Sequence, residues 1–214
     1  MEQEILRLKA KAKNLRDFDM YEDAINCIKK AIVILESVER GKETDEDISE
    51  MADCYGIMGG LYRRWGLNEI SNPSIKNQRL SESSKAYAKG GEYEKKTKFP
   101  SSYNSLNSQI ALIFEQADII NENSFKNNLQ KIKENIEKQI NTYRKKDIWA
   151  LADLFLIKLL LNIDAQQSFK EFNAGSPPQF IFTSLLSTLE PLAKLNTLIK
   201  PRLNEAVDIL KRLT

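Results

Sequence analysis

Small and apolar residues recur every three or four positions near the start of this chain, and this spacing restricts the folds that the chain can adopt. In two runs separated by a short polar break, the recurring residues are Leu8, Ala12 and Leu15, then Ala24, Ile28 and Ala31. Residues three or four apart lie on one face of a helix, and small side chains allow two helices to approach closely where they cross. The spacing therefore predicts a hairpin of two packed helices, over Glu2–Phe18 and Tyr21–Glu39.

The same rhythm continues through the rest of the chain. Further helices are predicted at residues 48–65, 80–96, 103–122, 125–145, 148–162, 165–174, 179–195 and 201–213. Small residues recur where later helices should cross, at Gly59 with Gly90 and at Ala152 with Ala165. The chain has only 8 glycines and 6 prolines, half of them between these segments, whereas a β-sheet protein needs many turn residues. The sequence therefore predicts an all-α fold.

Turn-forming and capping residues mark the ends of several predicted helices. The stretch Gly66–Asn77 contains an Asn-Pro pair and is predicted to be a loop. Ser124 and Asp147 each precede an apolar run, and we expect their side chains to cap the helices that follow.

This pattern resembles the tetratricopeptide repeat, a helix-turn-helix unit of roughly 34 residues. The resemblance is carried by Ile5–Glu36 and Lys146–Asn173, and to a lesser extent by Ala52–Glu94 and Pro100–Arg144. It implies a right-handed solenoid of helical hairpins with about four degenerate repeats. The expected organisation is one continuous domain, with repeats over residues 1–174 and capping helices over residues 175–214.

A narrower resemblance lies in the middle of the chain. The segments Tyr87–Glu94 (YAKGGEYE), Phe99–Asn104 (FPSSYN) and Asp147–Asp153 (DIWALAD), together with Asn107, are similar to the repeat-bearing, TRAF-binding regulatory region of apoptosis signal-regulating kinases. Related helical segments occur in bacterial signalling and conflict proteins. In that family the region contacts partner proteins and holds no catalytic residues. The resemblance therefore implies a regulatory part of a signalling or defence complex.

The composition argues against most forms of catalysis. The chain contains no histidine, which excludes Ser-His-Asp and Cys-His arrangements and histidine-ligated metals. Its two cysteines, Cys27 and Cys54, lie in apolar helical patterns and are predicted to be small buried thiols, as in a reducing, cytoplasmic compartment. The most apolar run, Ile148–Ile163, is too short and too charged to span a bilayer. We expect no enzymatic activity, no metal, no cofactor and no membrane contact.

The expected function is that of a protein-interaction or regulatory scaffold module. In stacked hairpins the first helix of each pair lines the concave face, and basic side chains there favour an acidic peptide or acidic surface of a partner protein. The residues predicted to contact that partner are Lys9, Lys13, Arg16, Arg63, Arg64, Asn104 and Ser108. Ordinary solvated surface charges are the alternative explanation. Assembly as a homo-oligomer or as a subunit of a larger complex is left open.

Nucleic-acid binding is the alternative function. The net charge is only +2, so any affinity for phosphates has to come from a local concentration of basic residues. The predicted helix at 125–146 has such a concentration, and its candidate phosphate contacts are Lys131, Lys138, Arg144 and Lys145. Phe180 and Phe182, which follow two prolines, either anchor a partner or a second copy of the chain, or cover the end of the solenoid.

Overall fold

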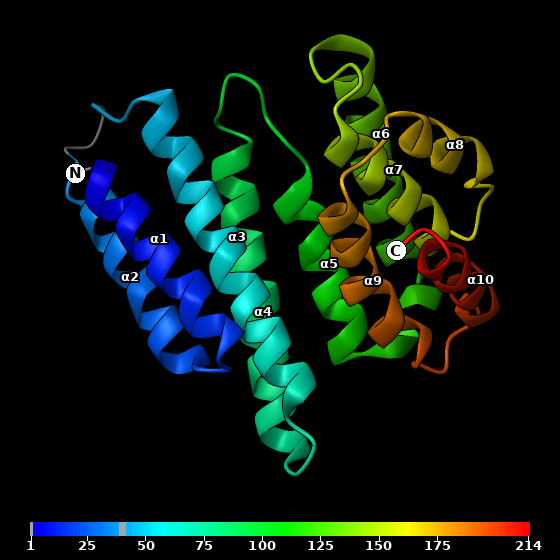
Figure 1. Cartoon of the computed structure of the whole chain (residues 1–214), viewed down its shortest axis with the longest axis horizontal. Helices are drawn as coiled ribbons and strands as arrows, with labels where there is room; N and C mark the ends of the chain where they lie inside the picture. Colours follow the sequence, from blue (N-terminus) through cyan, green and yellow to red (C-terminus); the bar gives the residue numbers. More distant parts are fainter. Residues whose placement is uncertain (1, 39–41) are drawn as a thin grey trace. The chain divides into compact units, whose positions relative to one another are not determined.

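The computed structural model describes residues 2–38 and 42–214, and these residues form an all-helical protein (Figure 1). It contains 10 α-helices, 79% of it is helical, and the described residues include no strand, which confirms the predicted all-α class. The chain divides into two compact units, Met1–Glu115 (unit 1) and Gln116–Thr214 (unit 2). No helix in the described part of the chain combines the length and the apolar character needed to cross a membrane.

Unit 1 is a succession of five helices, each packed against the next along the chain. Their bounds are α1 (Glu2–Asp17), α2 (Tyr21–Glu36), α3 (Asp45–Asn68), α4 (Pro73–Glu94) and α5 (Tyr103–Glu115). The small residues of the first predicted crossing, Ala12, Ala24 and Ala31, have no exposed surface. They belong to one apolar cluster that also includes Ile28 of α2 and Cys54 of α3. The spacing of small residues thus identified the core of the first hairpin.

Glycines allow close contacts among α3, α4 and α5. A Cβ atom built on Gly59 would lie 2.7 Å from the ring of Tyr87, and one built on Gly90 would lie 2.6 Å from Cγ of Asn104. Such distances are too short for real Cβ contacts, so both positions require glycine in this packing. The two glycines were expected to face each other. Instead, Gly59 makes room for Tyr87 and Gly90 makes room for Asn104.

Side-chain caps set the beginnings of several helices. Thr44 and Asp47 form a reciprocal capping box at the start of α3. The side chain of Asn72 accepts hydrogen bonds from two backbone N–H groups at the start of α4, so the loop predicted at Gly66–Asn77 is confined to residues 69–72. Asp147 caps α7 as predicted. Ser124 does not cap a helix, because α6 begins one residue earlier and Ser124 donates a hydrogen bond to Glu122 instead.

Unit 2 contains a short 3-10 helix followed by five α-helices. Their bounds are η1 (Ala117–Asn121), α6 (Asn123–Thr142), α7 (Ile148–Leu160), α8 (Gln166–Ala174), α9 (Gln179–Ala193) and α10 (Lys200–Lys211). Helix α6 packs against α7, α7 against α8, and α9 against α10. Phe182 is buried with its ring edge against Phe172, whereas Phe180 is exposed beside Trp149, with ring centres 6.1 Å apart. Phe182 therefore belongs to the core of unit 2, whereas Phe180 lies at its surface.

The boundary between the two units lies between Glu115 and Gln116, within the stretch predicted to form repeats. A helix was predicted over 103–122, but α5 ends at Glu115 and a separate turn of 3-10 helix follows. Gln116 between them has an extended backbone, with φ −143° and ψ 92°. Helix α5 packs against α4 in unit 1, and η1 packs against α6 in unit 2. The chain therefore passes from contacts within unit 1 to contacts within unit 2 at this extended residue.

Candidate functional site

Lys9, the first of the expected partner contacts, is held between α1 and α3 by two carboxylates. Its Nζ atom lies 2.8 Å from Oε2 of Glu50 and 2.5 Å from Oδ2 of Asp53, and 9% of the residue is exposed. Burial disfavours the ammonium form, but the hydrogen bonds to Asp53 and Glu50 outweigh it and raise the pKa of Lys9 above its ordinary value. Lys9 therefore joins two helices of unit 1 and is not presented to solvent.

Arg63 is also directed into the unit. Only 9% of it is exposed, and its Nη1 atom donates a hydrogen bond of 2.8 Å to Oδ1 of Asn107 on α5. Its guanidinium carbon lies 5.8 Å from the centre of the Tyr87 ring, within the range of a cation–π contact. Arg63 thus connects α3 to α4 and α5.

Asn104 and Ser108 on α5 are packing residues. Asn104 is 2% exposed, and its Nδ2 atom donates a hydrogen bond of 2.9 Å to the backbone carbonyl of Ala52 in α3. Ser108 is 6% exposed, and its hydroxyl donates a hydrogen bond of 3.4 Å to the carbonyl of Ser84 in α4. Both were expected to face a partner because they lie on the first helix of a predicted hairpin. Their side chains instead fill the contact between helices.

Three of the predicted contact residues remain at the surface: Lys13 and Arg16 on α1, and Arg64 on α3. We call these three the Arg16–Arg64 surface. Lys13 and Arg64 are exposed and Arg16 is half-buried, with its guanidinium 2.8 Å from the carboxylate of Asp17. Arg64 forms no ion pair with any described residue. Partial enclosure of its guanidinium, and then the positive charges of Arg16 and Arg63, lower the pKa of Arg64.

An acidic and aromatic group borders this surface at the turn between α1 and α2. The hydroxyl of Tyr21 donates a 2.6 Å hydrogen bond to Asp19 and accepts one of 2.9 Å from Asn68. Burial, and next the bond to Asp19, raise the pKa of Tyr21 to about 12, so its hydroxyl stays protonated. Because Asp17 and Asp19 lie on this side, the uncompensated charge of the surface is concentrated at Arg64 and Lys13.

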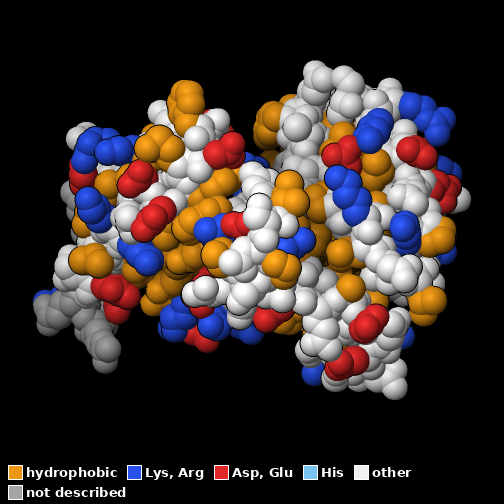
Figure 2. All heavy atoms as spheres, turned by 90° about the horizontal axis from the view of Figure 1, so that it is seen from below, with side chains coloured by type: hydrophobic (Ala, Val, Ile, Leu, Met, Phe, Trp, Pro, Cys, Tyr) orange, Lys and Arg blue, Asp and Glu red, His pale blue; other side chains and the backbone are white. Residues whose placement is uncertain are grey.

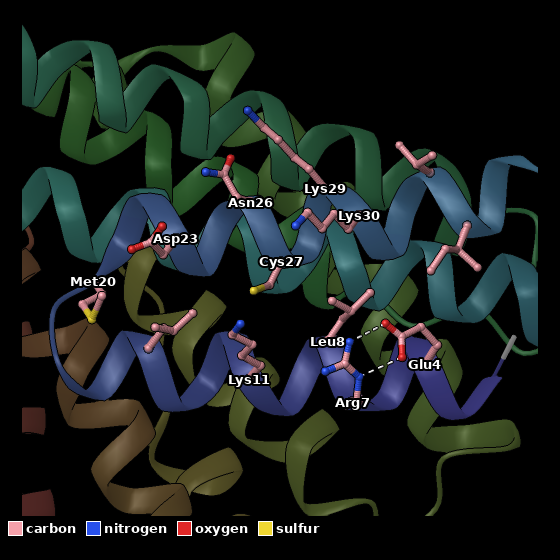
Figure 3. A pocket seen from close by; sticks show the side chains of 13 residues that line it. Glu4, Arg7, Leu8, Lys11, Met20, Asp23, Asn26, Cys27, Lys29 and Lys30 are labelled. Carbon is pink, nitrogen blue, oxygen red and sulfur yellow. Dashed lines mark hydrogen bonds and ion pairs between the residues drawn. The ribbon is translucent and has the colours of Figure 1, made fainter.

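A groove runs between α1 and α2 on another face of the first hairpin (Figure 3). It has a volume of about 990 Å³. Its residues are Glu4, Arg7, Leu8, Lys11, Leu15, Met20, Asp23, Asn26, Cys27, Lys29, Lys30, Val33 and Ile34. On α1 they follow a spacing of three or four and occupy a different face from Lys9, Lys13 and Arg16. The groove is therefore distinct from the Arg16–Arg64 surface, and no sequence motif singled it out.

The basic residues around α6 are only partly available. Lys131 and Lys138 are exposed, and neither forms an ion pair with a described residue. Arg144 lies after the end of α6, where its Nε atom is 2.8 Å from the carboxylate of Asp147. Lys145 is exposed in the turn before α7 and is not helical, because α6 ends at Thr142. Of the four predicted phosphate contacts, therefore, only Lys131 and Lys138 lie on α6.

Charges of both signs are interspersed on the molecular face shown in Figure 2, with apolar side chains between them. This agrees with a net charge of only +2 for the whole chain. Long-range attraction of a strongly charged partner would be weak under these conditions. Any electrostatic selectivity must therefore come from local groups such as Arg64.

The described residues contain no cluster of three or more His, Cys, Asp or Glu side chains that could hold a metal ion. Cys27 and Cys54 are free and buried, as the sequence predicted. Burial raises the pKa of Cys54 to about 12, so its sulfur stays a protonated thiol and is a poor nucleophile. These thiols serve packing.

The fold and these surfaces define an all-helical protein with two compact units and local basic patches. The chain matches no protein-family model, no curated protein and no solved structure. Its function therefore has to be inferred from its own surfaces.

Proposed function

We propose that this chain is a non-catalytic, cytoplasmic interaction or scaffold module that binds an acidic segment of a partner protein at the Arg16–Arg64 surface. The proposal includes a tetratricopeptide-like, right-handed stacking of hairpins in which this surface belongs to the concave side. The consecutive packing of α1 to α5 supports it, because each helix contacts the next as in stacked hairpins. Repeat proteins of this kind mostly bind other macromolecules.

One observation supports this choice of surface above the others. Arg64 is an exposed residue whose partly enclosed guanidinium forms no ion pair with any described residue and lies beside further cations. A carboxylate from a partner would relieve that repulsion and form charge-assisted, bidentate hydrogen bonds with the guanidinium. Lys9 and Arg63, by contrast, have their partners inside the unit. The buried residues thus hold the helices in place, and Arg64 is the group left to contact a ligand.

We expect Arg64→Glu to weaken partner binding at least tenfold, which corresponds to about 1.4 kcal/mol or more. The measurement compares proteins captured from the native host by the wild-type chain and by the variant, with quantification by mass spectrometry. The substitution replaces an exposed residue, so the helical content and thermal transition should be unchanged. The affected partners should carry acidic segments.

Lys126→Glu provides the matched control, since it makes the same change of charge at an exposed position on α6. It should capture the same proteins as the wild-type chain. Equal capture by wild type, Arg64→Glu and Lys126→Glu would contradict a role for Arg64 in partner binding.

Nucleic-acid binding through α6 is the second candidate. The supporting observation is that Lys131 and Lys138 are exposed and form no ion pair with a described residue. They are seven positions apart, so they lie close to the same face of the helix. Phe125 does not extend this surface, because it is buried in unit 2.

A salt titration tests this second function. Binding to a fluorescein-labelled DNA duplex would fall steeply with salt, and Lys131→Glu with Lys138→Glu would reduce the logarithmic slope by about 1.8, the value for two lost phosphate contacts. The control is Lys170→Glu, at an exposed position on α8. No binding at low salt, or an unchanged slope in the double variant, would exclude this use of α6.

A further inference from the structure

The groove between α1 and α2 combines an apolar floor with a rim that is mainly basic. Leu8 and Cys27 are buried at its base, and Met20 and Val33 are 46% and 63% exposed at its edge. In Figure 3 the side chains of Leu8 and Lys11 on α1 and of Cys27 on α2 are directed toward the space between the two helices, whereas Asn26 and Lys29 extend away from α1. Water-exposed apolar side chains that line a concave surface are typical of a site for another macromolecule.

The charges of the groove are unequal. Its lining contains four cations and two carboxylates. One carboxylate is already used, because Glu4 forms a two-point ion pair with Arg7 at 2.6 and 2.8 Å. Lys11, Lys29 and Lys30 form no ion pair with any described residue. Asp23 is the remaining acid, so the groove presents an excess of unpaired positive charge beside its apolar floor.

The dimensions match a short helix. From Glu4 to Leu15, α1 rises by roughly 17 Å, the length of about three helical turns. A surface formed by two neighbouring helices accepts a third helix through interdigitated side chains. Such helix-in-groove recognition uses apolar anchors spaced by three or four residues. Leu8, Leu15, Met20 and Val33 would receive those anchors.

We propose that this groove binds an acidic amphipathic helix of a partner protein, with its apolar face on the groove floor and its carboxylates against Lys11, Lys29 and Lys30. The charge of the lining selects this occupant. A second copy of the chain that docked through the same face would bring like charges together, which disfavours self-association. The site is additional to the Arg16–Arg64 surface and uses a different face of α1.

The test uses three stapled peptides of about three helical turns, labelled with fluorescein. The first has leucines along one face and glutamates beside them, the second has lysines in place of the glutamates, and the third has serines in place of the leucines. We expect the first peptide to bind the full chain, with at least tenfold weaker binding of the other two in fluorescence anisotropy. Absence of binding by the first peptide, or equal binding of all three, would overturn the proposal.

Two variants of the protein locate the site. Val33→Glu and Lys30→Glu each change an exposed side chain, so the fold should persist, and each should weaken the acidic peptide at least tenfold. Lys126→Glu and Arg64→Glu should bind it like wild type, which separates this proposal from that for the Arg16–Arg64 surface. Unchanged affinity in both groove variants would overturn the groove as the site. So would a wild-type dimer in sedimentation that Val33→Glu dissociates, because a second copy would then fill the groove.

Discussion

Replacing Ala24 with glutamate is expected to unfold unit 1 or to destabilise it by about 4 kcal/mol or more. Ala24 has no exposed surface and lies in the cluster that joins α1 and α2, so a carboxylate there would lose its hydration without gaining a partner. The measurement is urea denaturation followed by tryptophan fluorescence in a Trp149→Phe background. Trp65 on α3 is then the only tryptophan and reports on unit 1.

Ala24→Gln separates charge from size at the same position. Its side chain has nearly the same volume as glutamate but no charge, so it should destabilise unit 1 less. Desolvation would raise the folded-state pKa of the new glutamate, and the difference between the variants should therefore shrink as the pH falls through that value. A fluorescence transition unchanged by Ala24→Glu would show that Ala24 is not at a close helix crossing.

The second large effect is expected at Gly90. An alanine Cβ at this position would stand 2.6 Å from Cγ of Asn104, and Asn104 cannot move freely because it is buried and bonded to Ala52. Helix propensity favours Gly→Ala by about 1 kcal/mol, but overpacking costs about 1 to 3 kcal/mol and pushes α4 away from α5. We expect Gly90→Ala to destabilise unit 1 by up to about 2 kcal/mol in the same denaturation experiment, which is the overpacking cost less the gain in helix propensity.

A double-mutant cycle identifies the cause of this loss. In an Asn104→Ala background the obstructing side chain is absent, so Gly90→Ala should become neutral or stabilising. Gly60→Ala serves as the control, since its nearest neighbour, Oη of Tyr87, would be 3.3 Å away and Asn104 is not among the neighbours of Gly60. If Gly90→Ala lowered the free energy of unfolding equally in both backgrounds, the steric explanation would be wrong.

The helices, and the positions at which another helix comes close, could be predicted because they depend on local chemistry. The apolar period located α1 and α2, and the capping preference of Asp identified the start of α7. The clustered glycines of α3 indicated close approach by another helix. The partner of each glycine could not be predicted, because it depends on how the axes of α3, α4 and α5 cross, which the sequence of one helix does not determine.

The ends of α5 and α6 show where local patterns fail. Apolar residues continue past Glu115, so periodicity alone extends the helix, yet the chain becomes extended at Gln116 and turns into η1. Similarly, Ser124 is a favourable capping residue, but a helix that begins at Asn123 already includes it. Tertiary packing therefore determines where α5 ends and where α6 begins, and the local helix propensity of the sequence has the weaker influence.

The candidate site was harder to predict than the fold. Helical spacing correctly placed Lys9, Lys13 and Arg16 on one face of α1, but it could not tell which of them would meet an acidic residue of α3. Glu50 and Asp53 precede the basic part of α3 by about three turns, and only the packing of the two helices brings them to Lys9. Burial in the folded unit thus distinguishes the cations that have internal partners, such as Lys9, from those that remain at the surface.

The bridge from Lys9 to Glu50 and Asp53 also determines how α1 responds to protons. Its pKa is raised above the ordinary value of 10.5, so the folded chain holds this proton more tightly than the unfolded chain does. The resulting stabilisation is fully present below the unfolded pKa and is lost only as the pH rises through the folded-state pKa. Modest acidification or alkalinisation around neutrality therefore leaves the Lys9 ammonium charged. The contact between α1 and α3 through Lys9 is not expected to respond to pH in this range.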